Sequence, residues 1–432
     1  MRLITDLHIH SRFSRACSKE LTIPNIAAAC ARKGIHLVTT GDCTHPQWRQ
    51  EIGALLTEDA PGIFRLHSPH APTAAAQQTQ FLLGTELSCI YKHDGKVRRV
   101  HHLVLFPSLA ALDHLIAQLE EKGCNLRSDG RPILGISSAE LLERCLTSDP
   151  RTLVIPAHAW TPWFAVFGSE SGYDALAECF GSLAPHIVAI ETGLSSDPAM
   201  NRRLSSLDGV ALVSSSDAHS LEKLAREATV LELTEYSFAA VTAALRSSAS
   251  ATYDAHAPNR IIETIEFFPE EGKYHDDGHR ACGVRCTPSE TRRHRGQCPQ
   301  CGKPMTVGVM HRVDKLADRG EDGALARAPG FRRIVPLDEI ISEACNVRSL
   351  TPRVRAQRER LLDAVGNEFY VLLDAPLEHI ARSASPEVVE AIRRVRAGEL
   401  DIAPGYDGEF GTVHIFTPER PRPVAMQHSF FS

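Results

Sequence analysis

The chain begins with Met1-Arg-Leu-Ile-Thr-Asp-Leu-His-Ile-His10, and this stretch decides the predicted fold. Its apolar residues predict a short strand. Asp6, His8 and His10 are spaced two residues apart on it, so their side chains are expected to leave the same face. Two imidazoles and a carboxylate at the end of a strand can hold a metal ion, but an ordinary first strand with buried histidines has the same pattern. The rest of the chain must decide between these two interpretations.

Further apolar runs repeat this arrangement through residue 255, and helix-like segments separate several of them. The runs are Ile35–Thr39, Phe81–Glu86, His101–Phe106, Leu153–His158, Ile187–Glu191 and Val210–His219. Alternating strands and helices predict an α/β fold with a parallel sheet. Nearly every run carries His, Asp or Glu at or just beyond one end, and the strand ends of a (β/α) barrel converge on one face. This convergence favours the metal site.

The residue types also indicate a chemistry. Imidazole nitrogen and carboxylate oxygen suit Zn²⁺, Mn²⁺ or Fe²⁺, and a shared carboxylate can bridge two ions about 3.5–4 Å apart. Such a pair of ions polarises phosphoryl oxygens and lowers the pKa of a bound water. The pattern therefore predicts hydrolysis at phosphorus.

Six motifs in this order resemble those of the polymerase-and-histidinol-phosphatase (PHP) superfamily. They are Asp6-Leu-His8-Ile-His10, Gly41-Asp42, Gly84-Thr-Glu86, His102-Leu, Pro156-Ala-His158 and Ser216-Asp217-Ala-His219. The resemblance implies a distorted seven-stranded (β/α) barrel over residues 1–255 with two or three divalent ions, Zn²⁺, Mn²⁺ or Mg²⁺. It implies one ion on His8, His10, Glu86 and Asp217, a second shared by Glu86 with His102 and His158, and a third near Asp42 and His219. Asp217, Glu86 and His219 would then carry the catalysis, and Asp6 would orient a ligand imidazole.

Two features depart from the PHP pattern. The histidine expected after Asp42 is replaced by Cys43, and His45 comes two residues late, so either could substitute at the third ion. The choice between His101 and His102 also stays open, because adjacent residues of a strand face opposite ways.

A second metal motif follows the barrel. His279-Arg-Ala-Cys282-Gly and Cys298-Pro-Gln-Cys301-Gly share the spacing of zinc knuckles, in which glycine lets the chain turn around the cysteine sulfur. Together they predict one structural Zn²⁺ site. The fourth ligand is either His279, which the parallel spacing favours, or Cys286.

Charge is unevenly distributed along the chain. The whole protein has a formal net charge of −6. Residues 280–333, in contrast, contain twelve Lys or Arg and five Asp or Glu. This excess suits a polyanion bound across the zinc module, although a solvated basic face would have the same composition.

The later runs 302–313, 334–341 and 404–411, together with the barrel motifs, resemble the endonuclease Q family. That resemblance implies a barrel at 1–255, a zinc-binding basic module at 256–333 and a mainly helical DNA-binding region at 334–432. It implies a DNA repair endonuclease that cuts 5′ to deaminated bases (hypoxanthine, uracil, xanthine) or abasic sites. A flipped nucleotide would be read in a pocket beside the metals, bordered by residues 44–48 and 191–197, with Trp48 either stacking on the base or packing in the core. A small-molecule phosphatase of histidinol-phosphatase type and a non-catalytic DNA-binding module are the alternatives.

The remaining expectations concern location and partners. No apolar run approaches eighteen residues and most of the twelve cysteines are scattered singly, which predicts a cytoplasmic protein associated with the nucleoid through DNA. Gln427-His-Ser-Phe-Phe431 is similar to peptides that dock on sliding clamps, although a frayed terminus is the better interpretation.

Overall fold

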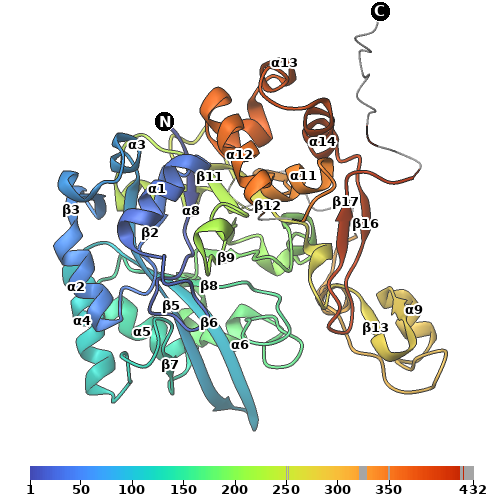
Figure 1. Ribbon diagram of the computed structural model, residues 1–432. Coiled ribbons are helices and arrows are strands. Elements are labelled where there is room, and N and C mark those ends of the chain that lie inside the picture. The colour runs from blue at the N-terminus through green and yellow to red at the C-terminus, as the bar shows by residue number, and fades with distance from the viewer. Residues whose placement is uncertain (250, 252, 321–327, 349–350, 419–421, 423–432) are drawn as a thin grey trace, which may run out of the picture.

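Seven strands form the distorted barrel in this computed structural model, which describes residues 1–249, 251, 253–320, 328–348, 351–418 and 422 (Figure 1). They are β1 (Arg2–Asp6), β2 (Leu37–Thr39), β5 (Gln80–His93), β6 (Lys96–Phe106), β8 (Leu153–Pro156), β9 (Ala189–Glu191) and β10 (Ala211–Val213). β1, β2 and β5 pair in parallel, as do β9 and β10. The predicted α/β class is therefore confirmed.

The predicted parallel pairing does not hold at β6, which pairs antiparallel with both β5 and β8. No helix separates β5 from β6. The chain reverses through Asp94 and Gly95, which both have positive φ (50° and 74°), as a tight two-residue hairpin requires. It is therefore the middle of β6, where His101 and His102 lie, that reaches the functional end of the barrel.

Helices cover the outside of this sheet. They are α1 (Ile23–Lys33), α2 (Pro46–Leu55), α3 (Ala74–Gln77), α4 (Leu109–Glu121), α5 (Ser138–Ser148), α6 (Leu176–Phe180), α7 (Pro198–Asn201) and α8 (Phe238–Ser247). α1 ends at Gly34, whose left-handed φ of 91° lets its amide bond Cys30 O.

Further strands extend the sheet. They are β3 (Leu56–Ala60), β4 (Ile63–Leu66), β7 (Ile133–Leu134), β11 (Ala228–Glu232), β12 (Arg260–Glu266) and β15 (Gly330–Arg333). β11 pairs with β1, β12 with β11, and β15 with β12. The sheet thus continues across the predicted domain boundary at residue 255, and the division of the chain into three domains stays a prediction.

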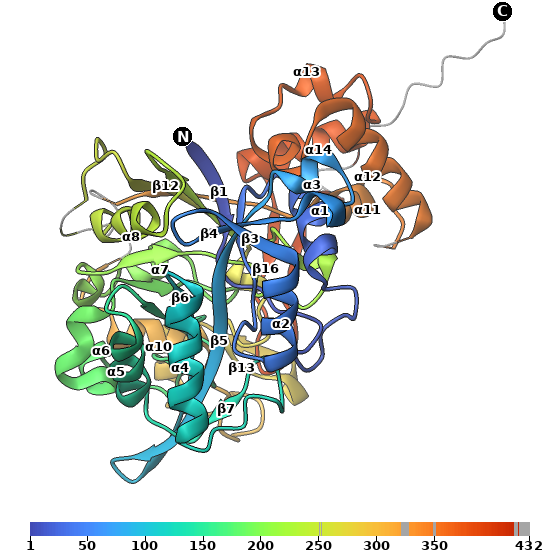
Figure 2. The ribbon, with the colours of Figure 1, turned by 90° about the vertical axis from the view of Figure 1, so that its left-hand side faces the viewer.

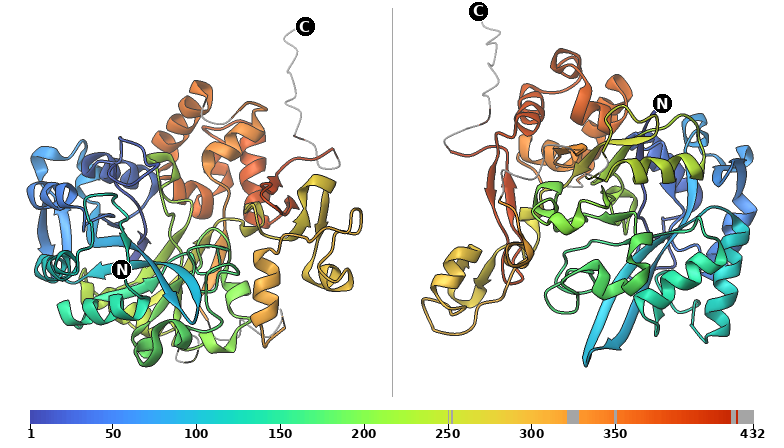
Figure 3. Two further views of the ribbon diagram at one scale, coloured as in Figure 1. Left: turned by 90° about the horizontal axis from the view of Figure 1, so that it is seen from below. Right: turned by 180° about the vertical axis from the view of Figure 1, so that it is seen from behind.

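Two smaller parts flank the barrel (Figures 1 and 3). The first contains β13 (Asp277–His279), β14 (Val284–Cys286), α9 (Pro288–Arg293) and α10 (Val309–Leu316), and its β13–α9 end projects away from the barrel. The second is mainly helical, as expected, with α11 (Leu337–Ala344), α12 (Pro352–Val365), α13 (Leu377–Ile380), α14 (Pro386–Ala397), β16 (Asp401–Ala403) and β17 (Thr412–His414). The segment Gln427–Phe431 lies outside the described residues.

Among the described residues, no helix has both the length and the apolar character needed to cross a membrane.

Candidate metal centre

Four side chains from three separate segments, three of them buried and one partly exposed, meet at the mouth of the barrel. The ligand atoms of His8, His10, Glu86 and Asp217 lie within 4.8 Å of one another. His10 Nε2 is 3.0 Å from Asp217 Oδ1 and 3.3 Å from Glu86 Oε2. The segment after β1 lies beside the Asp217 segment, because Ile9 forms a parallel bridge with Ala218. The structure thus assembles the four residues predicted for the first ion.

A second group shares Glu86. His101 Nδ1 is 2.7 Å and His158 Nε2 is 3.0 Å from Glu86 Oε1, whereas the first group faces Glu86 Oε2. The two carboxylate oxygens therefore face two different sets of imidazoles. This is the arrangement that a carboxylate bridging two ions requires.

The structure selects His101 rather than His102 for this group. His102 Nε2 bonds Ser138 Oγ at 2.8 Å, and its ring packs 5.5 Å from that of Phe180. Burial and the nearby His101 lower the pKa of His102 to about 3, so it stays neutral within the core. The structure therefore does not place His102 as the expected ligand. Neighbouring residues of a strand face opposite sides, which is why the sequence left the choice between His101 and His102 open.

Asp42 does not join either group. Its Oδ1 lies 3.0 Å from His10 Nδ1, and its Oδ2 accepts bonds from the Ser11 amide and from the Ser11 and Ser14 hydroxyls at 2.6–2.8 Å. With both oxygens occupied, Asp42 orients His10 instead of forming the third ion site expected from the PHP pattern.

The other residues expected near a third ion are dispersed. His45 stacks on Phe13 with ring centroids 4.4 Å apart, and Cys43 is fully buried. His219 does reach the site, with its ring 4.6 Å from that of His10, and its Nδ1 bonds the Asp217 carbonyl at 2.8 Å. These placements do not assemble the predicted third group.

Glu191 is the residue that sequence reasoning missed most clearly. Its carboxylate lies 3.0 and 3.1 Å from His8 Nδ1 and accepts the His158 amide at 2.8 Å, so it connects the two groups. Glu191 could have been recognised from the sequence, because it stands at the end of a predicted strand.

Asp6 was expected to orient an imidazole, but it accepts the Ser216 amide at 3.0 Å and the Ala225 amide at 3.4 Å. β1 ends at Asp6, so the two-residue alternation does not run on through His8.

Arg131 is a second unpredicted neighbour. It donates to Glu86 Oε2 at 3.0 Å from a loop without regular structure. Asp129 Oδ1 accepts the amides of Arg131 and Arg15 at 3.1 and 3.0 Å, and Gly130 N bonds Phe13 O at 3.1 Å. These anchors fix a guanidinium directly on the carboxylate that the two groups share.

Backbone strain is concentrated at this centre. His158, Asp217 and Asp42 have φ values of 31°, 46° and 46°, in the left-handed region that non-glycine residues avoid. Gly193 is needed beside them, because a Cβ at this position would lie 2.5 Å from His158 Cβ. Such positions persist where the surrounding structure over-determines them, as at functional sites.

Electrostatics keep the carboxylates ionised. Burial alone would raise the pKa of Glu86, but His101, Arg131 and His8 hold it well below its usual range. Burial likewise opposes ionisation of Asp217, yet His8 and His10 lower its pKa strongly. Ionised buried carboxylates are the form that binds a cation.

One buried atom tests whether these residues fit metal ions. His8 Nε2 is fully buried and has no hydrogen-bond partner, although Glu86 Oε2 and Asp217 Oδ1 face it at 3.6 and 3.7 Å. Glu191 occupies the other ring nitrogen, which favours the tautomer whose Nε2 lone pair points at those oxygens. Burial opposes protonation of His8, but Glu191, Glu86 and Asp217 together raise its pKa, so a proton can occupy Nε2; a divalent ion between Nε2 and the two carboxylates would take the place of that proton.

A cavity of about 710 Å³ opens beside the two groups. His158, Asp217 and His219 line one side, and residues 161–164, 193–195 and 269–275 form the other walls. Trp163 is 40% exposed here, and its ring lies 5.5 Å from that of Tyr274. Trp48, in contrast, is fully buried and bonds Gly41 O at 2.8 Å, so it packs in the core and offers no stacking surface.

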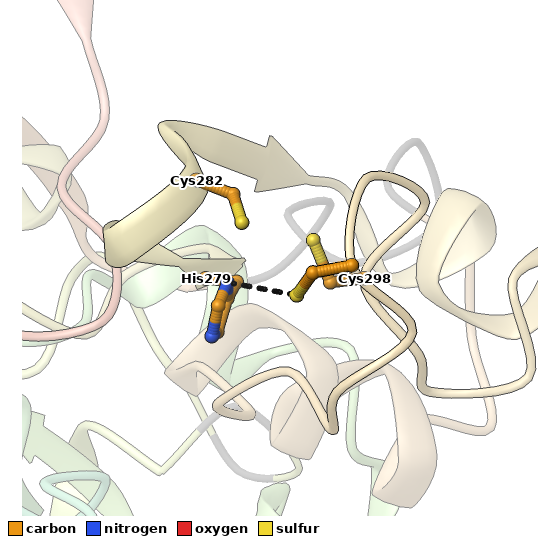
Figure 4. A group of neighbouring side chains, drawn as sticks. His279, Cys282 and Cys298 are labelled. Carbon is orange, nitrogen blue, oxygen red and sulfur yellow. Dashed lines mark hydrogen bonds between the residues drawn. The ribbon is translucent and has the colours of Figure 1, made fainter.

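The zinc-knuckle residues also come together. His279, Cys282, Cys298 and Cys301 place their ligand atoms within 4.8 Å of one another. Figure 4 shows Cys282 and Cys298 turned toward the same gap, and His279 Nδ1 lies 3.7 Å from Cys301 Sγ. Cys286 is buried in β14 and does not belong to this group.

Comparisons with known proteins agree with this architecture. The MJ0043 C-terminal domain model matches residues 336–399. The uncharacterized protein YqxK of Bacillus subtilis is 29% identical over 429 residues, which cover 95% of this chain and 99% of YqxK. MJ0043 of Methanocaldococcus jannaschii is 29% identical over 270 residues, and the chain spans about a third of its length (32%).

Two solved structures match nearly the whole chain. The lesion-specific endonuclease PfuEndoQ from Pyrococcus furiosus has a TM-score of 0.83 and 30% identity, with 96% of both chains covered. Endonuclease Q in complex with a 27-mer duplex substrate carrying an abasic lesion at the active site has a TM-score of 0.82 and 31% identity, with 97% of this chain and 98% of that chain covered. At this identity and coverage, the chain belongs to the endonuclease Q family.

Proposed function

We propose that this protein is a metal-dependent DNA repair endonuclease that cuts the phosphodiester on the 5′ side of a deaminated base or an abasic site. The observation that carries the proposal is the match, over 97% of the chain, to endonuclease Q bound to duplex DNA with an abasic lesion at its active site. The assembled His, Glu and Asp groups supply the chemistry that such a cut requires.

We assign two divalent ions to the barrel, each of them Zn²⁺, Mn²⁺ or Mg²⁺. His8, His10, Glu86 and Asp217 would hold one ion, and Glu86 would share the second with His101 and His158. Bound divalent ions polarise a phosphoryl oxygen and acidify a water. Glu191 and Asp42 orient the imidazoles, and the Arg131 guanidinium faces the position of the scissile phosphate.

The cavity suits a nucleotide turned out of the duplex. Its volume of about 710 Å³ lies in the range of small-molecule sites, and the exposed face of Trp163 offers a surface for stacking. Because the cavity opens directly beside His158 and Asp217, a nucleotide held there would present its adjoining phosphate to the ions. Turning out a mispaired or missing base costs less than turning out a paired one, which favours lesions.

A structural Zn²⁺ is proposed for the knuckles, held by His279, Cys282, Cys298 and Cys301. The apolar cluster around them contains only Cys286, Cys298 and Met305 as buried members. A core this small does not stabilise a fold without a metal or another crosslink. Action on DNA also fits the expected cytoplasmic, nucleoid-associated location.

The test uses purified full-length protein with Mg²⁺ or Mn²⁺ and labelled duplexes carrying hypoxanthine, uracil, an abasic analogue or no lesion. We expect nicks only at lesions. Asp217→Asn should abolish nicking and retain DNA binding, while Glu121→Gln on the exposed end of α4 should behave as wild type. Turnover of p-nitrophenyl phosphate alone would favour the phosphatase alternative, and binding without cleavage by the wild type would favour the non-catalytic one.

A further inference from the structure

The β5–β6 hairpin extends beyond the rest of the barrel (Figures 1 and 2). Its strands pair continuously from Leu83 and Phe106 to His93 and Lys96, without a bulge. The Asp94–Gly95 turn has the two positive φ values of a tight hairpin, which matches the twist of the flanking strands. The projecting segment is therefore a regular two-stranded arm.

One face of this arm continues the metal centre outward. Side chains alternate along a strand, so Glu86, Ser88, Ile90 and Lys92 share a face. The register places His101 opposite Ser88, Arg99 opposite Ile90 and Val97 opposite Lys92, on that same face. Ser88 and His101 line the cavity, so the cavity rim leads directly onto the arm.

The opposite face attaches the arm to the barrel. The Tyr91 hydroxyl bonds the hydroxyls of Tyr173 and Ser138 at 2.8 and 3.2 Å. The guanidinium of Arg98 lies 4.0 Å from the Tyr173 ring centre and also bonds Gly172 O. These contacts fix which face of the arm is turned toward the cavity.

The arm carries positive charge that the protein does not neutralise. Lys92, Lys96 and Arg99 have no carboxylate within 4.0 Å among the residues that the structure places, and Asp94 is the only acid in residues 90–99. In the basic stretch after the barrel, Arg312, Arg319, Arg332 and Arg333 pair with carboxylates, whereas Arg293, Arg295 and Lys303 form no ion pair among the residues that the structure describes. An unneutralised basic strip leading away from a phosphodiester site matches the charge of a DNA backbone.

We propose that the β5–β6 hairpin is an arm that lies along the duplex on one side of the lesion, with Lys92 and Arg99 contacting phosphates. This inference rests on the proposed function. At about 3.3 Å per residue, Lys92 lies about 13 Å beyond Ser88 and the turn about 20 Å beyond it. Arg99 lies opposite Ile90, about 7 Å beyond Ser88, so with about 3.4 Å per base pair the Arg99 contact falls about two base pairs from the cavity rim and the Lys92 contact about four.

The first measurement is the salt dependence of binding to an abasic duplex, in Ca²⁺ so that binding is separated from cleavage. Each phosphate contact contributes about 0.9 to the slope of log Kd against log salt, so Lys92→Gln/Arg99→Gln should lower the slope by about 2. The same arithmetic gives an affinity loss of about ten- to thirty-fold at 0.15 M salt. Nicking at saturating DNA should stay unchanged, because neither side chain touches the metal ligands.

A matched control removes two positive charges from the far end of the barrel. Arg65→Gln/Arg246→Gln changes β4 and α8, which lie away from the arm in Figure 2. This variant should keep the wild-type slope. An unchanged slope in the arm variant, or an equal loss in the control, would overturn the inference.

Shortened duplexes test the placement. Trimming one flank to about one base pair should weaken wild-type binding and erase the difference between wild type and the arm variant, whereas trimming the other flank should preserve that difference. If both trims have the same effect, the arm does not lie along one flank. Failure of the wild type to nick any lesion would instead refute the proposed function, and the Ca²⁺ binding slopes would still decide whether the arm contacts DNA.

Discussion

His101 and His102 are neighbours on β6 with the same side chain, and the structure gives them opposite roles. His101 Nδ1 lies 2.7 Å from Glu86 Oε1, whereas His102 bonds Ser138 and packs on Phe180. His101→Gln should therefore reduce nicking of an abasic duplex and leave folding largely intact. His102→Gln should do the reverse.

The magnitudes follow from the contacts. Removing a group that only orients a metal ligand costs about 10–100-fold in metal affinity or activity, so loss of the His101 ligand should cost at least about 100-fold in kcat. That factor corresponds to about 2.7 kcal/mol of transition-state stabilisation. His102→Gln perturbs a buried hydrogen bond and a ring contact, for which we expect about 1–3 kcal/mol of unfolding free energy.

The assay pairs three measurements on both variants: bound Mn²⁺ or Zn²⁺ by elemental analysis, nicking rate at saturating DNA, and unfolding in urea. We expect His101→Gln to lose about one barrel ion per chain with little change in the urea midpoint. His102→Gln should keep its ions and lose stability. If His102→Gln lost its ions and activity while His101→Gln kept both, the assignment of faces on β6 would be wrong.

Three further predictions follow from other contacts. Cys282→Ser should lose about one zinc per chain and lower the thermal midpoint, whereas Cys286→Ser in the same hairpin should keep its zinc. Glu191→Gln should weaken ion binding about 10–100-fold, measured by Mn²⁺ titration, and unchanged affinity would contradict its role in orienting His8. Burial raises the pKa of Glu266 from 4.5 to about 8, so the folded state keeps a proton that the unfolded chain releases, and stability falls as pH rises between these values. Glu266→Gln should remove this pH dependence, which amounts to at most about 5 kcal/mol of unfolding free energy over the whole interval. The measurement is urea unfolding at pH 5 and pH 8. If the exposed Glu121→Gln had an equal effect, the pH dependence would not come from Glu266.

The sequence predicted the barrel because its evidence is local. Each strand is a short apolar run, and the polar residue that reaches the site stands at or near the end of that run. His8, His10, Glu86 and His158 could therefore be assigned before their partners were known. Their agreement with one family pattern supplied the long-range pairing that periodicity alone does not contain.

The misplaced residues share a physical cause, which is dependence on register or on irregular backbone. Which of His101 and His102 faces Glu86 depends on the pairing of β6 with β5, and the Asp94–Gly95 turn sets that register. Arg131 reaches the site from an irregular loop. The loop is held by the bond from Gly130 N to Phe13 O and by the bond from the Arg131 amide to Asp129 Oδ1. Such positions have no periodic signature.

Some arginines of the basic stretch 280–333 make contacts within the protein, and the expectation that this stretch binds DNA stays a prediction. Arg312 bonds Phe167 O and Tyr173 O at 2.8 and 2.9 Å, close to the loop that carries Trp163. Arg333 pairs with Asp197 at the barrel mouth and with Glu270 beside the opposite wall of the cavity. These arginines join the two parts of the chain that enclose the cavity. Changing them should therefore affect the width of the cavity more than the attraction of the protein for phosphate. We therefore expect lesion discrimination and affinity for the duplex to depend on different cations, the first at this joint and the second on the β5–β6 arm.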